Sequence, residues 1–183
     1  MAEERPESNV QPALSEQLIE LIPRLRRFAC GLSGSSDSGD ELVQAACERL
    51  LQRQTQLRAD TRLVSWMYRV IRNLHLDGLR AQSVRERGAE TLLREVTESP
   101  ATADRSMDNH LLLHEVQAAM QRLSEEHRSA LMLICVEGIS YQDAADILQV
   151  PVGTVTSRLV RARKALLKTM GHADGNSVLE ASG

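Results

Sequence analysis

The last third of the chain contains a run of side chains suited to binding a polyanion. Between Val152 and Lys168 there are five cations and no carboxylate. These cations are Arg158, Arg161, Arg163, Lys164 and Lys168. Arginine can donate a pair of hydrogen bonds to a guanine edge, while lysine and hydroxyl side chains contact phosphates. The segment therefore predicts a helix face that binds nucleic acid, the alternative being an ordinary solvated basic face.

The residues around this run predict a helix-turn-helix. A stripe with the spacing of one buried helix face accompanies the cations, and its members are Val155, Leu159, Ala162 and Leu166. Upstream, Ser140-Tyr-Gln-Asp143 is typical of a capping box that opens a short helix, and Gln149-Val-Pro151 turns the chain. In such a motif the second helix enters the major groove of DNA.

Other residue types that could do chemistry are few. His110 and His114 share a helix face at a spacing that can bind zinc, but no third ligand stands nearby. We therefore predict surface histidines, no metal, no cofactor and no enzymatic activity. The odd number of cysteines argues against a disulfide framework, which leaves small buried side chains or a redox-sensing thiol. They are Cys30, Cys47 and Cys135.

The elements that would position these residues are helices throughout. The 183 residues allow one medium or two small domains, and with 2% aromatic residues the core must be aliphatic. Nearly every periodic segment has helical spacing, so an all-α fold is predicted. No apolar run approaches the length of a membrane span, and the polar start is unlike a signal peptide, which predicts a cytoplasmic protein without membrane insertion.

Composition divides the chain into five segments. We predict a polar tail (1–13), a helical domain (14–83), a flexible acidic linker (84–105), a second helical domain (106–170) and a C-terminal tail (171–183). Within the domains, residues 31–39 are predicted as a loop, and Asp40 and Ser124 as helix caps.

Charge limits what the two domains can bind alone. Residues 14–83 contain ten cations and eight acids, and residues 116–170 contain seven and five, so each has a net charge of +2, while the whole chain has −3. A protein that binds DNA unaided usually carries a strongly basic domain. A further partner is therefore expected to supply affinity.

Two blocks resemble one family. Residues 138–163, GISYQDAADILQVPVGTVTSRLVRAR, are similar to region 4.2 of bacterial RNA polymerase sigma factors of the extracytoplasmic-function (ECF) type. Residues 65–80, SWMYRVIRNLHLDGLR, are similar to regions 2.3 and 2.4, and Leu42 to Gln44 to region 2.2. The resemblance covers about residues 15–170.

The resemblance implies a fold and a set of partners. The first domain would be the helical bundle of sigma region 2, which docks on the clamp helices of the largest catalytic subunit of core RNA polymerase and melts the minus-ten promoter element. The second would be the helix-turn-helix of region 4, which reads the minus-thirty-five element. Two domains on a flexible linker, each with an exposed functional face, also predict an anti-sigma factor that clamps them together as inhibitor. The regulon expected is one of stress, envelope or metal-response genes.

Site residues follow by matching positions. The polymerase contacts implied are Glu41, Gln44 and Glu48. The minus-ten contacts implied are Leu57, Arg58, Asp60 and Thr61, in a loop that would hold a flipped base, and Asn73, Asp77 and Arg80. The minus-thirty-five contacts implied are Thr154, Thr156, Ser157, Arg158, Arg161 and Lys164.

The chain departs from the family pattern at several positions. Leu57 stands where the base pocket usually has an aromatic residue, and Gln149 stands where glycine often makes the turn. If Gln149 has a positive φ, it costs on the order of 1 kcal/mol. Two other readings remain open, an adaptor that only titrates an anti-sigma factor and a plain helix-turn-helix repressor. The second leaves residues 14–83 unexplained.

Overall fold

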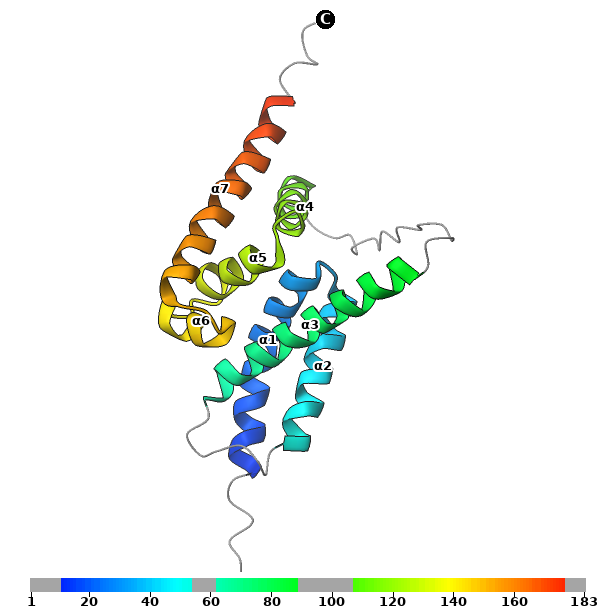
Figure 1. The fold of residues 1–183 in the computed structure, drawn as a ribbon, viewed down its shortest axis with the longest axis vertical. Helices are drawn as coiled ribbons and strands as arrows, with labels where there is room; N and C mark the ends of the chain where they lie inside the picture. The colour runs from blue at the N-terminus through cyan, green and yellow to red at the C-terminus, as the bar shows by residue number, and fades with distance from the viewer. Residues whose placement is uncertain (1–10, 54–61, 89–106, 177–183) are drawn as a thin grey trace, which may run out of the picture.

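A computed structural model describes residues 11–53, 62–88 and 107–176, and these residues are helical throughout with no strand among them (Figure 1). The helices are α1 (Gln11–Ser33), α2 (Ser36–Arg53), α3 (Leu63–Gly88), α4 (Met107–Gln121), α5 (Glu125–Leu131), the π-helical η2 (Met132–Val136), α6 (Tyr141–Leu148) and α7 (Val152–Asn176). The all-α prediction is confirmed. None of the described helices combines the length and apolarity that crossing a membrane requires.

Helices α1, α2 and α3 form the first bundle. Leu25, Phe28 and Leu32 recur on one face of α1 and are fully buried. The ring of Phe28 meets that of Tyr68 on α3 edge to face, with centroids 4.9 Å apart. This aromatic contact joins α1 to α3 at the centre of the core.

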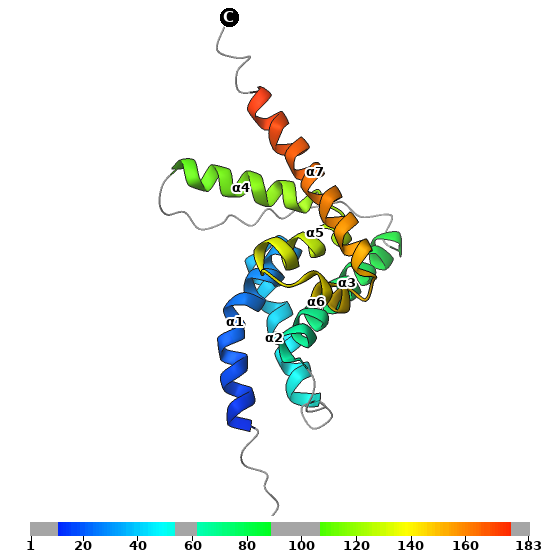
Figure 2. The ribbon, with the colours of Figure 1, turned by 90° about the vertical axis from the view of Figure 1, so that its left-hand side faces the viewer.

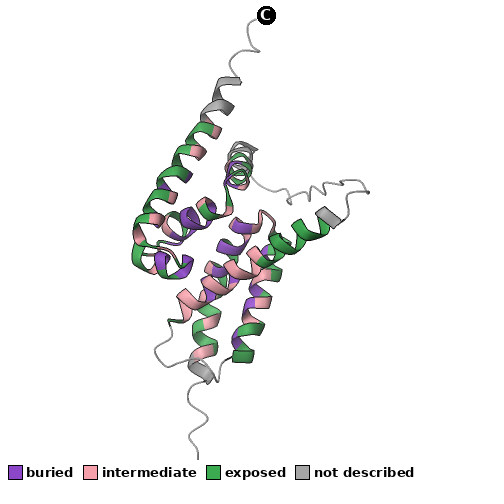
Figure 3. Ribbon diagram, in the orientation of Figure 1, coloured by how far each residue is buried: buried purple, intermediate pink, exposed green. Residues whose placement is uncertain are grey.

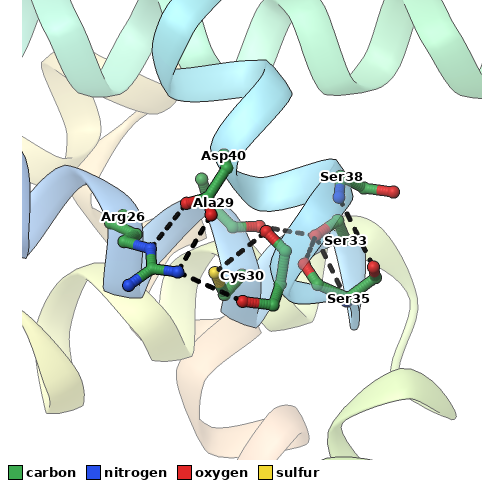
Figure 4. Close-up of polar contacts among 8 residues, drawn as sticks. Arg26, Ala29, Cys30, Ser33, Ser35, Ser38 and Asp40 are labelled. Atoms are coloured by element: carbon green, nitrogen blue, oxygen red, sulfur yellow. Dashed lines mark hydrogen bonds and ion pairs between the residues drawn. The ribbon is translucent and has the colours of Figure 1, made fainter. Parts of the chain in front are cut away.

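The connection between α1 and α2 is shorter than predicted. The expected loop at residues 31–39 is wrong, because α1 continues to Ser33 and α2 begins at Ser36. Figure 4 shows the turn: the Ser33 hydroxyl donates to the Ala29 and Ser35 carbonyls, at 3.0 and 2.9 Å. Asp40 does not cap the helix but accepts from Arg26 Nη2 at 2.9 Å. Hydrogen bonds of the serine side chains therefore stabilise a tight turn in place of the predicted loop. This turn holds α2 against α1.

The second group comprises α4, α5, η2, α6 and α7, and its helix-turn-helix is as predicted. The Ser140 hydroxyl accepts from the Asp143 backbone N–H at 3.1 Å, which caps α6. Gln149 ends α6 with φ of 57°, in the left-handed region. On α7, Val155, Leu159 and Ala162 are buried. Much of the visible side of this helix is exposed (Figure 3). Ser124 is the N-cap residue of α5, as predicted, but its side chain makes no capping hydrogen bond.

The two groups pack directly against each other. Helix α6 lies beside the first half of α3, and η2 lies against α1 (Figures 1 and 2). Buried side chains of both groups belong to one continuous hydrophobic cluster. Helix α3 continues to Gly88, past the boundary predicted at residue 83, and residues 89–105 of the predicted linker lie outside the described residues.

Candidate nucleic-acid interface

Helix α7 presents most of the predicted cations and hydroxyls to solvent. Thr156, Ser157, Arg161 and Lys164 are exposed, and Thr154 is half-buried. With 3.6 residues per turn these positions fall on one side of the helix, opposite Val155, Leu159 and Ala162. The Ser157 hydroxyl donates to the Thr154 carbonyl at 3.0 Å, which keeps its lone pairs outward. The outward side of α7 can therefore present cationic donors and hydroxyl acceptors to a groove of DNA.

Arg158 lies elsewhere on α7. Its Nη2 is 3.0 Å from Glu126 Oε2 on α5, and its side chain is only 14% exposed. Its Nη1 is buried with no hydrogen-bond partner. The structure therefore places Arg158 beside the buried stripe, apart from the open face formed by Arg161 and Lys164.

Val160 is a residue of this face that the sequence reasoning missed. Its side chain is 60% exposed, between Thr156 and Lys164 one turn to either side. An apolar side chain on a groove-facing helix can contact the methyl group of thymine. Val160 is apolar but does not share the spacing of the buried stripe, and this mismatch could have identified it from the sequence.

The minus-ten residues that the structure describes lie on α3. Asn73 is half-buried, Asp77 and Arg80 are exposed, and Arg80 Nη1 lies 3.3 Å from Asp77 Oδ1. The spacing of these residues puts them along one side of the helix. The other four predicted contacts lie outside the described residues: Leu57, Arg58, Asp60 and Thr61.

The predicted polymerase contacts share the exposed side of α2. Glu41, Gln44 and Glu48 are exposed, and Gln44 Nε2 donates to Glu48 Oε1 at 3.1 Å. The opposite side of α2 buries Val43, Ala46 and Leu50 in the core. A groove of about 710 Å³ between α2 and α3 has Glu41 among the side chains that line it. Helix α2 therefore offers an acidic and amide surface away from α7.

A buried carboxylate joins the two groups of helices, and no local sequence pattern predicts it. The Glu137 side chain, just after η2, is fully buried. It accepts from Arg27 Nε at 2.8 Å and Nη2 at 3.1 Å, and from Tyr68 Oη at 2.8 Å. Arg24 Nε lies 3.3 Å from it, and Arg24 Nη2 donates to the Glu137 backbone carbonyl at 2.8 Å.

These contacts stabilise the protonated forms of Arg27 and Tyr68. The hydrogen bond and charge of Glu137 raise the pKa of the Arg27 guanidinium. Burial, followed by the hydrogen bond to Glu137, raises the pKa of the Tyr68 phenol well above its ordinary value. The Glu137 carboxylate therefore binds two cations and a neutral hydroxyl from the first bundle.

A second polar cluster lies between α3 and α5. Arg72 Nε is 3.4 Å from Glu125 Oε1, with both side chains nearly buried. His75 lies beside this pair, and its Nε2 is buried without a hydrogen-bond partner. Burial, then the positive charges of Arg128 and Arg72, lowers the pKa of His75 against the opposing effect of Glu125. The neutral imidazole therefore suits this site.

The cysteine prediction is partly wrong. Cys30 and Cys47 are half-buried, but Cys135 is exposed, and Arg163 Nη2 donates to its Sγ at 3.2 Å. The predicted histidine pair lies on α4, where the His110 and His114 side chains are outside the described ones. Among the described residues no group of histidine, cysteine or carboxylate side chains could hold a metal ion.

A capped helix, a left-handed turn and a second helix with outward cations define a helix-turn-helix, a motif class that serves DNA recognition. Comparison with known families narrows this class. The model of sigma-70 region 4 matches residues 113–166, and that of the sigma2 domain of PhyR matches residues 18–72. The chain belongs to the ECF RNA polymerase sigma factors.

Relatives match over most of the chain. It is 32% identical to the ECF RNA polymerase sigma factor EcfG of Rhodopseudomonas palustris (strain TIE-1), over 84% of this chain and 83% of that protein. It is 33% identical to the ECF RNA polymerase sigma-E factor of Escherichia coli (strain K12), over 70% of this chain and 73% of that protein.

A solved structure matches both domains together. The sigma factor RpoE from Bartonella quintana, in its complex with the anti-sigma factor NepR, superposes with a TM-score of 0.73 at 28% identity. The match covers 87% of this chain and 97% of that one. The recognition as an ECF sigma factor is thus confirmed.

Proposed function

We propose that this sigma factor binds core RNA polymerase through the exposed side of α2 and directs it to promoters through α3 and α7. The observation that carries the proposal is the outward side of α7, where Thr156, Ser157, Arg161 and Lys164 are exposed with no acid among them. Helix α2 faces elsewhere, so polymerase and DNA would occupy different surfaces. The clamp helices of the largest catalytic subunit are the surface to which Glu41, Gln44 and Glu48 would bind.

The outward side chains of α7 each have a role in this proposal. Arg161 and Lys164 would contact base edges or phosphates of the minus-thirty-five element. The Thr156 and Ser157 hydroxyls donate to backbone carbonyls of α7, so their oxygens would accept hydrogen bonds from base amino groups. Val160, which lies between Thr156 and Lys164, would pack on a thymine methyl. Arg158 would hold α7 against α5 through its ion pair with Glu126, and DNA binding would have to break this pair for Arg158 to contact the promoter.

The modest charge of each domain is consistent with DNA binding by the sigma factor and core polymerase together. A net charge of +2 on residues 116–170 gives little unaided affinity for DNA. Polymerase would supply most of the electrostatic attraction, and the sigma factor would supply sequence choice. The work would take place in the cytoplasm, where promoters and polymerase meet.

An anti-sigma factor is the regulator that best fits this protein. The superposed sigma factor RpoE is bound to one, the anti-sigma factor NepR. Since α2 and α7 must both be open to polymerase and DNA, an inhibitor that covers either would silence the chain. Stress, envelope or metal-response genes are the regulon we assign by family resemblance.

In vitro transcription from fragmented genomic DNA tests this function. Core polymerase with the protein should give discrete start sites absent with core alone. The Arg161→Ala and Lys164→Ala double variant should abolish most of them, because each such contact contributes about 1–3 kcal/mol. The matched control is Arg163→Ala on the same helix, where Arg163 contacts Cys135, and it should transcribe nearly as the wild type does.

Two other outcomes separate the alternatives. If the protein binds core polymerase but yields no new start sites, an adaptor that titrates an anti-sigma factor is the better account. If it binds promoter fragments but not core polymerase, the chain is a helix-turn-helix repressor.

A further inference from the structure

Five arginines of the first bundle point at the second group of helices, and we name them the arginine face. They are Arg24 and Arg27 on α1 and Arg62, Arg69 and Arg72 at or within the first half of α3. Arg24 and Arg27 bind Glu137, and Arg62 pairs with Asp143. Arg69 Nη2 donates to the Asp146 carbonyl at 2.8 Å, and Arg72 pairs with Glu125. The carboxylates that pair with the arginine face all belong to the second group.

Other arginines of the same bundle behave differently. Arg26, adjacent to Arg27 on α1, pairs with Asp40 of its own bundle, and Arg80 pairs with Asp77. The arginine face therefore depends on the second group of helices for its counter-charges.

The donor set around Glu137 also suits a phosphate. Arg27 binds its two carboxylate oxygens with a fork of Nε and Nη2, and Arg24 and Tyr68 donate from two further directions. The planar guanidinium fork matches carboxylate and phosphate oxygens equally well. The Glu137 carboxylate thus occupies a site that would accept a phosphate group if the second group moved away.

Promoter geometry requires that movement. The minus-ten and minus-thirty-five elements are about 25 base pairs apart, which is about 85 Å of duplex at 3.4 Å per step. Compact domains of about 70 residues are only roughly 30 Å across. Two such domains in direct contact do not reach both elements, so promoter binding must separate them and leave the arginine face without Glu137, Asp143 and Glu125.

The arginine face continues the DNA-facing side of α3. Arg62, Arg69, Asn73 and Arg80 follow one another at intervals of seven, four and seven residues, which keeps them on the same side of a helix. Arg24 and Arg27 adjoin this line, since Tyr68 on α3 shares their carboxylate. A strand that contacts Asn73 and Arg80 would therefore meet these arginines next along its backbone.

We propose that the arginine face is a phosphate-binding site for promoter DNA, and that in the free protein carboxylates of the second domain neutralise it, with Glu137 in the place of a phosphate. The inference rests on the proposed promoter binding. Opening of the protein then exchanges carboxylates for phosphates, so the four arginines that pair with carboxylates have an anionic partner in both states.

The salt dependence of promoter binding tests the phosphate site. Holoenzyme affinity for a fluorescent promoter fragment is measured by anisotropy across a range of salt concentrations, for the wild type and for the Arg24→Gln and Arg27→Gln double variant. Loss of two phosphate contacts should lower the slope of log affinity against log salt by about 1.4 to 1.8. Arg26→Gln on the same helix is the matched control and should keep the wild-type slope.

The outcomes of this experiment are distinct. Equal slopes for the double variant and the wild type overturn the inference. Arg24 and Arg27 would then serve only to hold the two groups of helices together in the free protein. Failure of the wild-type holoenzyme to bind the promoter better than core polymerase would overturn the proposed function as well.

A second measurement tests the covering role of Glu137 in the free chain. Glu137→Gln removes the competing anion and should raise affinity for a fluorescent single-stranded oligonucleotide about tenfold, an increase comparable to a coupling between two sites. Asp40→Asn, which frees Arg26 within the first bundle, should have a much smaller effect. Circular dichroism confirms folding of both variants, and an unchanged or lower affinity of folded Glu137→Gln would overturn the covering role.

Discussion

The backbone of Gln149 adopts a strained conformation that lowers the stability of the protein. It ends α6 with φ of 57°, a conformation that glycine adopts without strain and other residues do not. Its side chain is exposed, so a replacement removes no packing. Gln149→Gly should raise the free energy of unfolding by up to about 1 kcal/mol, measured by urea denaturation.

The same substitution elsewhere in α6 provides the control. Gln142 is exposed in the first turn of this helix. Gln142→Gly should lower the free energy of unfolding by up to about 1 kcal/mol, because glycine is a poor helix former. A loss of stability in Gln149→Gly would show that its side chain contributes more than its strained backbone costs.

His75 should make stability depend on pH. Its pKa is lowered in the folded protein, chiefly by burial and then by Arg128, from an unfolded value near 6.5. Between the two pKa values the unfolded chain binds more protons, so the free energy of unfolding falls as pH decreases through this window. Above 6.5 this contribution is fully present.

Urea denaturation of the wild type and His75→Gln across this pH range measures the effect. The variant should show a shallower fall in stability below pH 6.5. Because burial is the larger cause, the difference should persist in about 0.5 M salt, which screens charges but leaves desolvation intact. Parallel pH profiles for the two proteins would contradict this account of His75.

Sequence reasoning was least complete for residues whose partners are far away along the chain. The exposure of Arg161 and of Lys164 followed from helical periodicity alone. The burial of Arg158 against Glu126 did not, because periodicity cannot say which neighbouring helix carries a carboxylate. Glu137 resembled any surface acid, and only its contact with α1 reveals its role.

At the scale of elements, two serines before helices make a matched test of capping. Ser140 accepts a hydrogen bond from the Asp143 N–H, whereas Ser124 has the same position before α5 without such a bond. Ser140→Ala should lower the free energy of unfolding by about 1 kcal/mol. Ser124→Ala should change it by much less, and equal losses in thermal denaturation would show that the hydrogen bond is not the cause.

Helices with strong periodicity were predictable and their ends were less so. The buried stripe of α7 and the capping box of α6 follow directly from sequence. The loop predicted at residues 31–39 was wrong, because its glycines and serines are turn formers in isolation. In the folded chain Gly39 is buried against Cys30, where an added Cβ would lie 2.4 Å from Sγ, so this glycine serves close helix packing.

At the scale of the whole molecule, the packing of the two groups against each other is what sequence could not predict. The two domains were expected as separate units on a linker, and their contact depends on pairs such as Arg24 and Glu137, 113 residues apart. No local pattern encodes such a pair. The interface combines a shared hydrophobic cluster with the ion pairs of the arginine face.

The separation of the two domains is the central claim, and a distance measurement tests it most directly. Fluorophores are placed on α2 and α7 through Arg53→Cys and Leu167→Cys, both at exposed positions, with the exposed Cys135 replaced by serine. Energy transfer should be high in the free protein and should largely disappear when core polymerase and promoter DNA are added. Transfer that stays high in the promoter complex would contradict an account in which the closed sigma factor opens to reach both promoter elements.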